Sequence, residues 1–473
     1  MKILAHRFLL SVSLAILAAS HAVAQAPAPT PSDDALKAFN AQISAHWKAK
    51  EWPQAEALTR QLIATTPTPA TSRLRDLRTL LRLQGKTDEV AKLGLEITKR
   101  KDANSGDHNS VCWNFLIQNQ ALQARPYCET AVKLEADSFP ALVNLGHTYL
   151  LAGDAAAAQP WYAKTLANVP TEKDLQEGPL GDFDLFIKNG WQVPAATTAR
   201  NWFDTSWPAL KAIQKLRREA STLESDDKEA QAAPLLEQAI QQSTTLLGAD
   251  NDITQTLNVR LGRVLNAAGL AAYNSGNMTQ ANQWFEKSVA QRQTKLGADH
   301  PDTLTSMGNL ATTYSALGQN DKALAMQEKV LAARQTKLGA DHPDTLTSMG
   351  NLATTYSALG QNDKALAMEE KVLAARQTKL GADHPDTLTS MENLALTYRK
   401  MKQFPKAFAI LEQAVPKRIA RYGEADSPSA SLAALLMVTA ESLGRQSAVL
   451  NALTPTMLAK VRLQAQAIKA KGL

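Results

Sequence analysis

Three histidines stand beside carboxylates in one repeated context. His300, His342 and His384 each occur in Ala-Asp-His-Pro-Asp, and histidine next to aspartate is a combination used for metal binding and acid–base catalysis. The repetition favours another interpretation, because equivalent groups on stacked helices lie about 10 Å apart, too far for one ion to share. We therefore expect these residues to cap the helices that begin at the following prolines.

The sequence lacks the usual catalytic signatures. No G-x-S-x-G, H-E-x-x-H, Walker or G-x-G-x-x-G pattern occurs where the strand or helix that it requires would lie. We expect no catalytic residue, no metal site and no cofactor, and hence a protein that is not an enzyme.

The composition indicates an all-α chain. Of 473 residues, 44% are hydrophobic and only 5% aromatic, and the hydrophobic share comes mainly from Ala and Leu, which favour helices over sheets. Lys and Arg exceed Asp and Glu by 51 − 45 = 6. This small and evenly spread excess predicts neither a nucleic-acid partner nor binding to an anionic membrane.

The first residues have the pattern of an export signal. Lys2 and Arg7 precede an apolar stretch at 8–20, and Ala22-Val23-Ala24 supplies small residues for cleavage. As a helix this stretch would rise about 20 Å, short of the ~30 Å needed for a membrane anchor, which is the alternative. We expect a cleaved signal peptide at 1–24, a disordered Pro-rich leader at 25–34, no membrane span in the mature chain, and a periplasmic or secreted protein.

Internal repeats determine the predicted architecture. Residues 300–341 and 342–383 are identical except that Gln327 becomes Glu369, so the period is 42 residues. A third copy begins at His384, and a more divergent one occupies about 262–297.

Each unit has the pattern of a helix hairpin. Apolar residues recur at helical spacing in two runs, before and after the turn Gly318-Gln319-Asn320-Asp321. Pro301 suits the first turn of the first helix, and Leu338-Gly339 suits the end of the second.

The 42-residue unit resembles the tetratricopeptide repeat of the kinesin-light-chain type. The positions that carry the resemblance are Leu310, Ala311, Tyr314, Gly318 and Ala323, with their equivalents 42 residues on. One departure is that Gly308-Asn309 replaces the paired Asn of the family. Repeats of a shorter period precede this array, with the best match at 141–170. The resemblance implies an all-α solenoid of stacked helix hairpins in two arrays, and together with the N-terminal signal pattern we expect an exported bacterial-type chain.

The predicted organisation follows from this phasing. Its segments are the signal peptide 1–24, the leader 25–34, N-terminal 34-residue-type repeats 35–170, an aromatic-rich connector 171–207, C-terminal 42-residue repeats 208–445, and a C-terminal capping helix 446–473.

Cys112 and Cys128, the two cysteines of the chain, lie in the two helices of one predicted hairpin, 105–138. An exported chain meets an oxidising compartment, which favours a structural disulfide over a pair of buried thiols. Secreted bacterial proteins with similar repeats carry Cys-Trp and Tyr/Ala-Cys-Glu in successive helices, which resembles the context of both cysteines here. Their spacing excludes a C-x-x-C redox site.

The connector is rich in aromatic residues. Six of them fall between positions 183 and 207: Phe183, Phe186, Trp191, Trp202, Phe203 and Trp207. Such density indicates packing at a seam between the arrays, with an aromatic ligand site as the alternative.

The first helix of each hairpin supplies the predicted binding face. Counting from the core residues Leu310 and Tyr314 places polar side chains on the exposed side of these helices. We predict that a protein or peptide partner contacts Asn309, Thr312, Asn351, Thr354, Asn393, Arg399 and Lys400. Asn offers a donor and an acceptor, which suits an extended peptide backbone.

The sequence thus predicts a non-catalytic scaffold that binds a segment of another protein in the concave groove of a repeat array. Two alternatives are a structural spacer or oligomerisation module, and an enzyme with a pocket at the aromatic connector.

Overall fold

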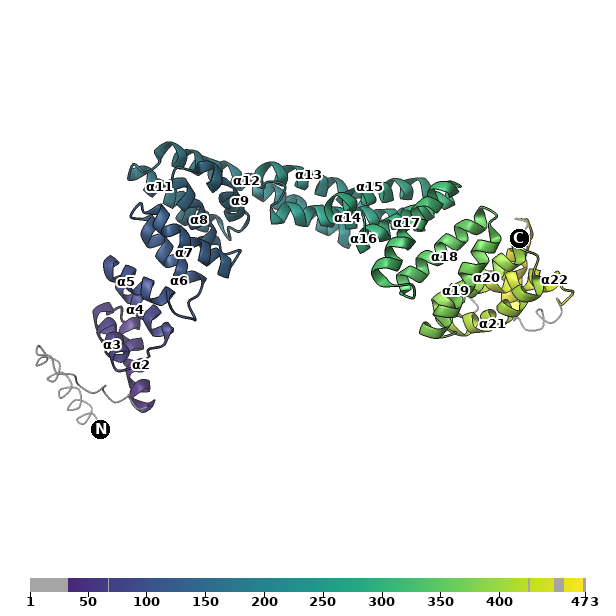
Figure 1. Ribbon diagram of the computed structural model, residues 1–473, viewed down its shortest axis with the longest axis horizontal. Coiled ribbons are helices and arrows are strands. Elements are labelled where there is room, and N and C mark those ends of the chain that lie inside the picture. Colours follow the sequence, from purple (N-terminus) through teal and green to yellow (C-terminus); the bar gives the residue numbers. More distant parts are fainter. Residues whose placement is uncertain (1–32, 67, 424–425, 446–454, 471–473) are drawn as a thin grey trace, which may run out of the picture. The chain divides into compact units, whose positions relative to one another are not determined.

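The computed structural model describes residues 33–66, 68–423, 426–445 and 455–470. Every element formed by these residues is a helix (Figure 1), which confirms the predicted all-α class. The predicted signal peptide 1–24 and most of the leader 25–34 lie outside the described residues. The first described helix, α2 (Asp33–Lys48), begins just before the predicted start of the repeats at 35.

The chain forms two compact units, which divide between Pro208 and Ala209. In the first unit, consecutive helices pair as hairpins α2/α3, α4/α5, α6/α7 and α8/α9. After α2 the helices are α3 (Trp52–Ala64), α4 (Thr71–Leu83), α5 (Thr87–Thr98), α6 (Ser105–Leu116), α7 (Ala121–Leu134), α8 (Phe139–Leu151), α9 (Ala155–Ala167), α10 (Glu172–Leu175), η1 (Gln176–Leu180), α11 (Gly181–Lys188) and α12 (Val193–Ser225), in which the unit boundary falls.

The second unit continues the same plan with longer hairpins, α14/α15, α16/α17, α18/α19 and α20/α21. Its helices are α13 (Glu229–Leu247), α14 (Asp252–Asn274), α15 (Met278–Leu296), α16 (Pro301–Ala316), α17 (Asn320–Leu338), α18 (Pro343–Ala358), α19 (Asn362–Leu380), α20 (Pro385–Lys400), α21 (Phe404–Tyr422), α22 (Ser427–Glu441) and α24 (Pro455–Ala470).

Local residue chemistry sets the ends of each hairpin. The Nδ1 atom of His300 accepts a hydrogen bond from the backbone N–H of Asp302 at 3.2 Å, and Pro301 occupies the first turn of α16. His342 and His384 cap α18 and α20 in the same way, so the predicted capping role of the histidines is confirmed. Gly339 ends α17 with a φ of 89°, a conformation that glycine adopts without strain.

Separate apolar clusters join neighbouring hairpins. Leu304, Met307 and Leu310 of α16 are buried together with Phe285 of α15 and Val330 of α17. The equivalent residues of later units form similar clusters. Because each cluster includes side chains from two consecutive hairpins, a hairpin buries its core only beside a neighbour.

At the C-terminal end, α22 is buried along nearly its whole length and packs against α24. Met457, Val461 and Ala465 of α24 are almost fully buried in the same cluster. Residues 446–454 of the predicted capping segment lie outside the described residues.

Candidate functional site

The first helices of successive hairpins form one row in the second unit. Helix α16 contacts α18, and α18 contacts α20, in addition to their partners within each hairpin. We call the side of this row that carries Asn309, Asn351 and Asn393 the inner-helix face. These residues occur every 42 positions, one before a core leucine, and all three are half-buried.

The inner-helix face is open at two glycines. A Cβ built on Gly308 or Gly350 would meet no atom within 4 Å. Each glycine directly precedes one of the row asparagines, so the backbone of α16 and α18 is accessible beside Asn309 and Asn351. A Cβ would therefore fit at either glycine without disturbing the core.

The three asparagines differ in what they bind. The Nδ2 of Asn309 donates to Oδ1 of Asn266 on α14 at 3.1 Å, and Ser306 donates to the same oxygen. Within the described part of the chain, no side-chain hydrogen bond engages Asn351 or Asn393. Two of the three amides therefore keep their donors and acceptors for another molecule.

The predicted threonines and lysine lie at the surface but are engaged locally. The hydroxyl of Thr312 donates to the carbonyl of Gly308, and that of Thr354 donates to the carbonyl of Gly350. Lys400 is exposed, and its Nζ donates to Ser357 Oγ at 2.9 Å, joining α20 to α18. These residues border the asparagine row: the two threonine hydroxyls use their donors locally, whereas the Lys400 ammonium keeps two of its three N–H donors free.

Arg399 does not lie on the exposed face of α20, so the prediction that its side chain is available to a partner is wrong. Its side chain is only 7% exposed, and its Nη1 donates to Thr439 of α22 at 2.7 Å. The guanidinium also lies over the ring of Phe404. Helix α22 packs over Arg399. The prediction counted exposed positions from Leu310 and Tyr314 within a repeat and did not consider a helix that follows the repeats.

Sequence reasoning missed a series of buried arginines at the hairpin junctions. Arg334 of α17 donates through Nη1 to the carbonyl of Asp344 at 3.1 Å and to Ser348 Oγ at 2.9 Å. Arg376 repeats both bonds with Asp386 and Ser390. Burial lowers the pKa of both guanidiniums. The 42-residue periodicity of Arg, Asp and Ser was the available signal, and these contacts lock successive hairpins.

Sequence reasoning also missed a basic hollow at the start of this unit. Two adjoining cavities lie between α12, α14 and the neighbouring helices, and both are lined by Arg260. The first is also lined by Arg217 and Arg218, the second by Arg263 and Arg292. The adjacent pair Arg217-Arg218 and the spacing of Arg260 and Arg263 along one helix were the available signals.

The aromatic residues of the connector belong mainly to the core of the first unit. Phe183, Phe186 and Phe203 are fully buried. The rings of Phe183 and Phe186 pack edge-on against His147, with centroids 5.0 and 4.9 Å away. Buried rings that pack against one another are core, and this arrangement gives no support to an aromatic ligand site.

His147 and its partners form a buried polar cluster that resembles a catalytic arrangement. Its Nδ1 lies 3.0 Å from the hydroxyl of Tyr162, and its Nε2 lies 3.2 Å from Oδ2 of Asp182. However, His147 is 0% exposed and Tyr162 only 1%, so a substrate has no access to them. The role of the cluster is structural: its hydrogen bonds connect α8, α9 and α11.

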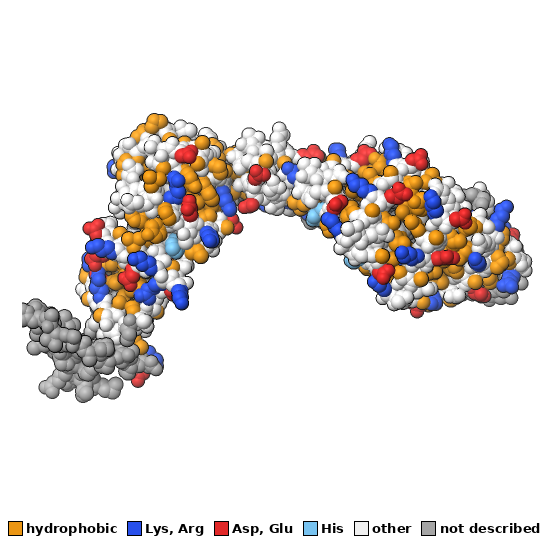
Figure 2. All heavy atoms as spheres, in the orientation of Figure 1, with side chains coloured by type: hydrophobic (Ala, Val, Ile, Leu, Met, Phe, Trp, Pro, Cys, Tyr) orange, Lys and Arg blue, Asp and Glu red, His pale blue; other side chains and the backbone are white. Residues whose placement is uncertain are grey.

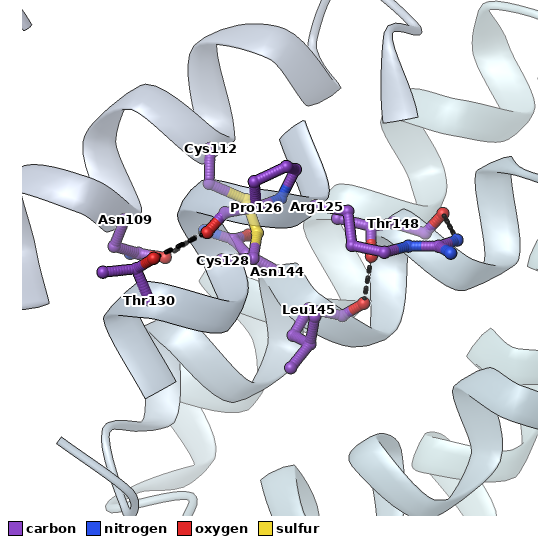
Figure 3. The surroundings of a disulfide bond; sticks show 9 residues. All are labelled: Asn109, Cys112, Arg125, Pro126, Cys128, Thr130, Asn144, Leu145 and Thr148. Atoms are coloured by element: carbon purple, nitrogen blue, oxygen red, sulfur yellow. Dashed lines mark hydrogen bonds between the residues drawn. A yellow bond between two sulfur atoms is a disulfide. The ribbon is translucent and has the colours of Figure 1, made fainter. Parts of the chain in front are cut away.

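The two cysteines lie next to each other inside the α6/α7 hairpin. Cys112 and Cys128 have Cα atoms 5.4 Å apart, a separation that a disulfide requires, and Figure 3 shows the bond between their sulfur atoms. Both side chains are 0% exposed. Asn144 of α8 donates to Asn109 of α6 nearby at 2.9 Å.

The described residues contain no group of three or more His, Cys, Asp and Glu side chains that could hold a metal ion. Nor is any described helix both long and apolar enough to cross a membrane. On the face shown in Figure 2, Lys and Arg side chains are interspersed with Asp and Glu over the described parts of both units.

Comparisons with known proteins agree with the helix-hairpin repeats. Residues 260–336, 321–378 and 370–419 match the tetratricopeptide repeat family. A kinesin light chain-related protein 2 of Arabidopsis thaliana is 37% identical over 67 residues, which are 14% of this chain and 10% of that protein. The match thus spans only about a tenth of the curated relative.

Solved structures of related repeats were also found. A putative kinesin light chain of Podosopora anserina with nearly identical repeats is 28% identical, covers 44% of this chain and 96% of its own, and has a TM-score of 0.34. BtubC (BKLC) of P. vanneervenii is 20% identical, covers 47% and 92%, and has a TM-score of 0.36.

Residues 260–419 therefore match the tetratricopeptide repeat family, as the motif positions predicted, and a 67-residue stretch of the chain is similar to a kinesin light chain-related protein. Proteins with this fold generally mediate protein–protein interactions.

Proposed function

We propose that the protein is a non-catalytic scaffold that holds a segment of another protein against the inner-helix face. The observation that carries this proposal is the open Gly350 next to the unengaged Asn351, together with the unengaged amide of Asn393 one hairpin further on. Gly350 leaves the backbone of α18 accessible, and the adjacent Asn351 has a free amide. An extended peptide needs both a donor and an acceptor at regular intervals, and the Asn351 and Asn393 side chains supply them one hairpin apart.

The energetics fit a partner that makes several such contacts. Each amide could form two hydrogen bonds, each contributing about 0.5–1.5 kcal/mol net. Removing two amides should therefore weaken binding by at least about tenfold, which corresponds to roughly 1.4 kcal/mol. Stability should change little, because Ala favours helix more than Asn does and neither side chain packs in the core.

The experiment uses the chain without its predicted signal as bait, with partners captured from an envelope extract. N351A/N393A should lose the captured partner while retaining its melting temperature; N309A/N351A/N393A should lose the partner as well but melt somewhat earlier, because it also breaks the Asn309–Asn266 hydrogen bond. G350W, which puts a bulky ring on the open position, should block binding as well.

The matched control is T336A/T378A. These threonines also recur at the repeat period, but they lie exposed on α17 and α19, the second helices of the same hairpins. This control should bind normally. If the asparagine variants bind normally but melt early, the row belongs to internal structure and the proposal fails.

We also propose that the chain is exported, since residues 1–24 have the pattern of a cleaved signal. Expression with the natural N-terminus should give a periplasmic or secreted protein that begins at Gln25. A protein that stays in the cytoplasm with Met1 intact would contradict this proposal.

A further inference from the structure

The hollow between α12 and α14 has a concentration of guanidinium groups. It has a volume of about 300 Å³ and is lined by Gln214, Arg217, Arg218, Ser221 and Arg260. Arginine therefore dominates its lining. The adjoining hollow along α14 is lined by Arg263, by Asp302 and by the buried Arg292, whose Nη1 donates to the carbonyl of Asp302.

The arginines of this hollow differ in their engagement. Arg260 is anchored: its Nε donates to Glu224 at 2.7 Å, and its Nη2 donates to Ser221 Oγ at 2.7 Å. Arg263 donates to the other oxygen of the same carboxylate at 2.6 Å. One carboxylate is thus shared by two guanidiniums.

Arg217 has no such partner. Among the described residues, no hydrogen bond or ion pair engages its guanidinium or that of Arg218. Arg217 is half-buried, and burial together with the charge of Arg260 lowers its pKa. An anion placed between Arg217 and Arg260 would supply an acceptor for the Arg217 guanidinium and offset the repulsion between the two cations.

We propose that this hollow is a binding site for a phosphate group, with Arg217 and Arg218 as its principal ligands and Arg260 fixed behind them. The charge balance favours phosphate over a single carboxylate. Three arginines less the Glu224 charge leave an excess of two, which a phosphate monoester of about −1.5 to −2 neutralises. Its three terminal oxygens also accept from several guanidiniums at once, whereas a carboxylate has two.

The site is specific to this end of the array. The positions one repeat after Arg260 and Arg263 are Asp302 and Thr305, and the next repeat has Asp344 and Thr347. The duplicated hairpins therefore do not reproduce the basic hollow. The site also stands apart from the asparagine row, so its failure would leave the proposed scaffold function standing.

Phosphate binding to the full chain without residues 1–24 tests this proposal, measured by isothermal titration calorimetry at low salt. Inorganic phosphate and a peptide containing phosphoserine are the two probes. Saturable binding of either probe supports the site. If the peptide binds more tightly, the natural ligand is a phosphate group carried by a protein; if the two probes bind equally, it is free phosphate. An absence of saturable binding for both overturns the proposal.

Two variants on one helix separate a site from general charge. R217Q removes a charge from the hollow and should weaken phosphate binding by at least about tenfold. K215Q removes the same charge from an exposed position of α12 that does not line the hollow, and should bind as the parent does. If both variants weakened phosphate binding equally, the effect would come from the net charge of the protein and not from a site, and the proposal would be overturned. Glutamate that competes as well as phosphoserine would overturn the phosphate assignment.

Discussion

The ring of Phe285 occupies the space that a side chain on Gly269 would need. A Cβ built on Gly269 would lie 2.6 Å from Cε1 of Phe285, closer than any normal contact. The same relationship joins Gly146 to Tyr162 in the first unit, where a Cβ would lie 2.4 Å from the ring. A small residue on the first helix and a large one on the second thus set how closely a hairpin closes.

We predict that G269A destabilises the protein. Forcing the phenyl ring aside costs about 1–3 kcal/mol, which outweighs the helix preference of Ala over Gly. G350A is the matched control, because a Cβ there meets nothing, and it should stabilise by about 0.5–1 kcal/mol. Chemical denaturation measures both. Equal stabilities would show that Phe285 moves without cost.

The equivalent position in the duplicated hairpins is polar. Gln327 and Glu369 replace the Phe285 ring, and the next hairpin has Leu411 there. Glu369 is only 4% exposed, and burial raises the pKa of its carboxyl to about 7. The single difference between the two repeats therefore places a buried acid where its twin has a neutral amide.

This predicts a stability that depends on pH through Glu369. Its ordinary pKa is 4.5, so between pH 4.5 and 7 the folded state binds more protons than the unfolded state. Stability must therefore fall as the pH rises through this window, by roughly 1.36 kcal/mol per unit, and level off above 7. E369Q should lose this slope and be more stable than the parent at pH 8.

The reciprocal variant Q327E is the control for Glu369. It places the same acid at the equivalent position one hairpin earlier, where Ala358 stands in place of Lys400, and it should add a second fall in stability as the pH rises. Denaturant melts at pH 5 and pH 8 decide the matter. Parallel pH curves for the parent, E369Q and Q327E would mean that Glu369 ionises freely in the folded protein.

The cysteine pair yields a chemical prediction. Because Cys112 and Cys128 are fully buried, free thiols would also escape a label in the native state. Alkylation must therefore be done in denaturant, without reductant, on protein from the oxidising compartment. Mass spectrometry should find neither cysteine labelled, and both labelled after reduction. C112S/C128S should lose roughly 3 kcal/mol, as expected for a loop of about 15 residues. Full labelling of both cysteines before reduction would show that they are free thiols and would contradict the predicted disulfide.

The sequence predicted the architecture well because a repeat displays the same rule many times. The periodicity of apolar residues located the hairpins, and Pro301 and Gly339 located helix ends. Because these signals recur every 42 residues, a helix end that is uncertain in one repeat can be placed from its equivalents in the others. The site was less predictable. The helical count placed both Asn351 and Arg399 on the exposed side of their helices; Asn351 is half-buried, whereas Arg399 is buried because α22, which lies outside the repeated pattern, packs over it.

The basic hollow was harder to predict still. Arg217 and Arg260 are far apart in the sequence and meet only through the pairing of α12 with the next hairpin, where Nη1 of Arg260 donates to the carbonyl of Arg217. Their partnership depends on Glu224 satisfying one guanidinium and not the other, and no spacing rule encodes that. Which side chains of different helices contact one another could therefore be read only from the structure.

The final prediction concerns removal of one whole repeat, residues 342–383. The main contacts across the new junction have counterparts in the present chain. Arg334 would meet Asp386 and Ser390 at the spacing it now has to Asp344 and Ser348. Tyr398 would donate to Glu328 in place of Tyr356, whose hydroxyl now donates to it at 2.8 Å.

The shortened chain should therefore stay folded, helical and soluble, with a smaller denaturant m-value because less surface is exposed on unfolding. Deletion of 342–361 is the control, since it removes α18 with its turn and leaves α19 without a partner. That half-repeat deletion should lose both cooperativity and stability. If the whole-repeat deletion instead lost its helical circular dichroism across the entire chain, the second unit would be one indivisible core, and nearest-neighbour packing of hairpins would not explain its stability.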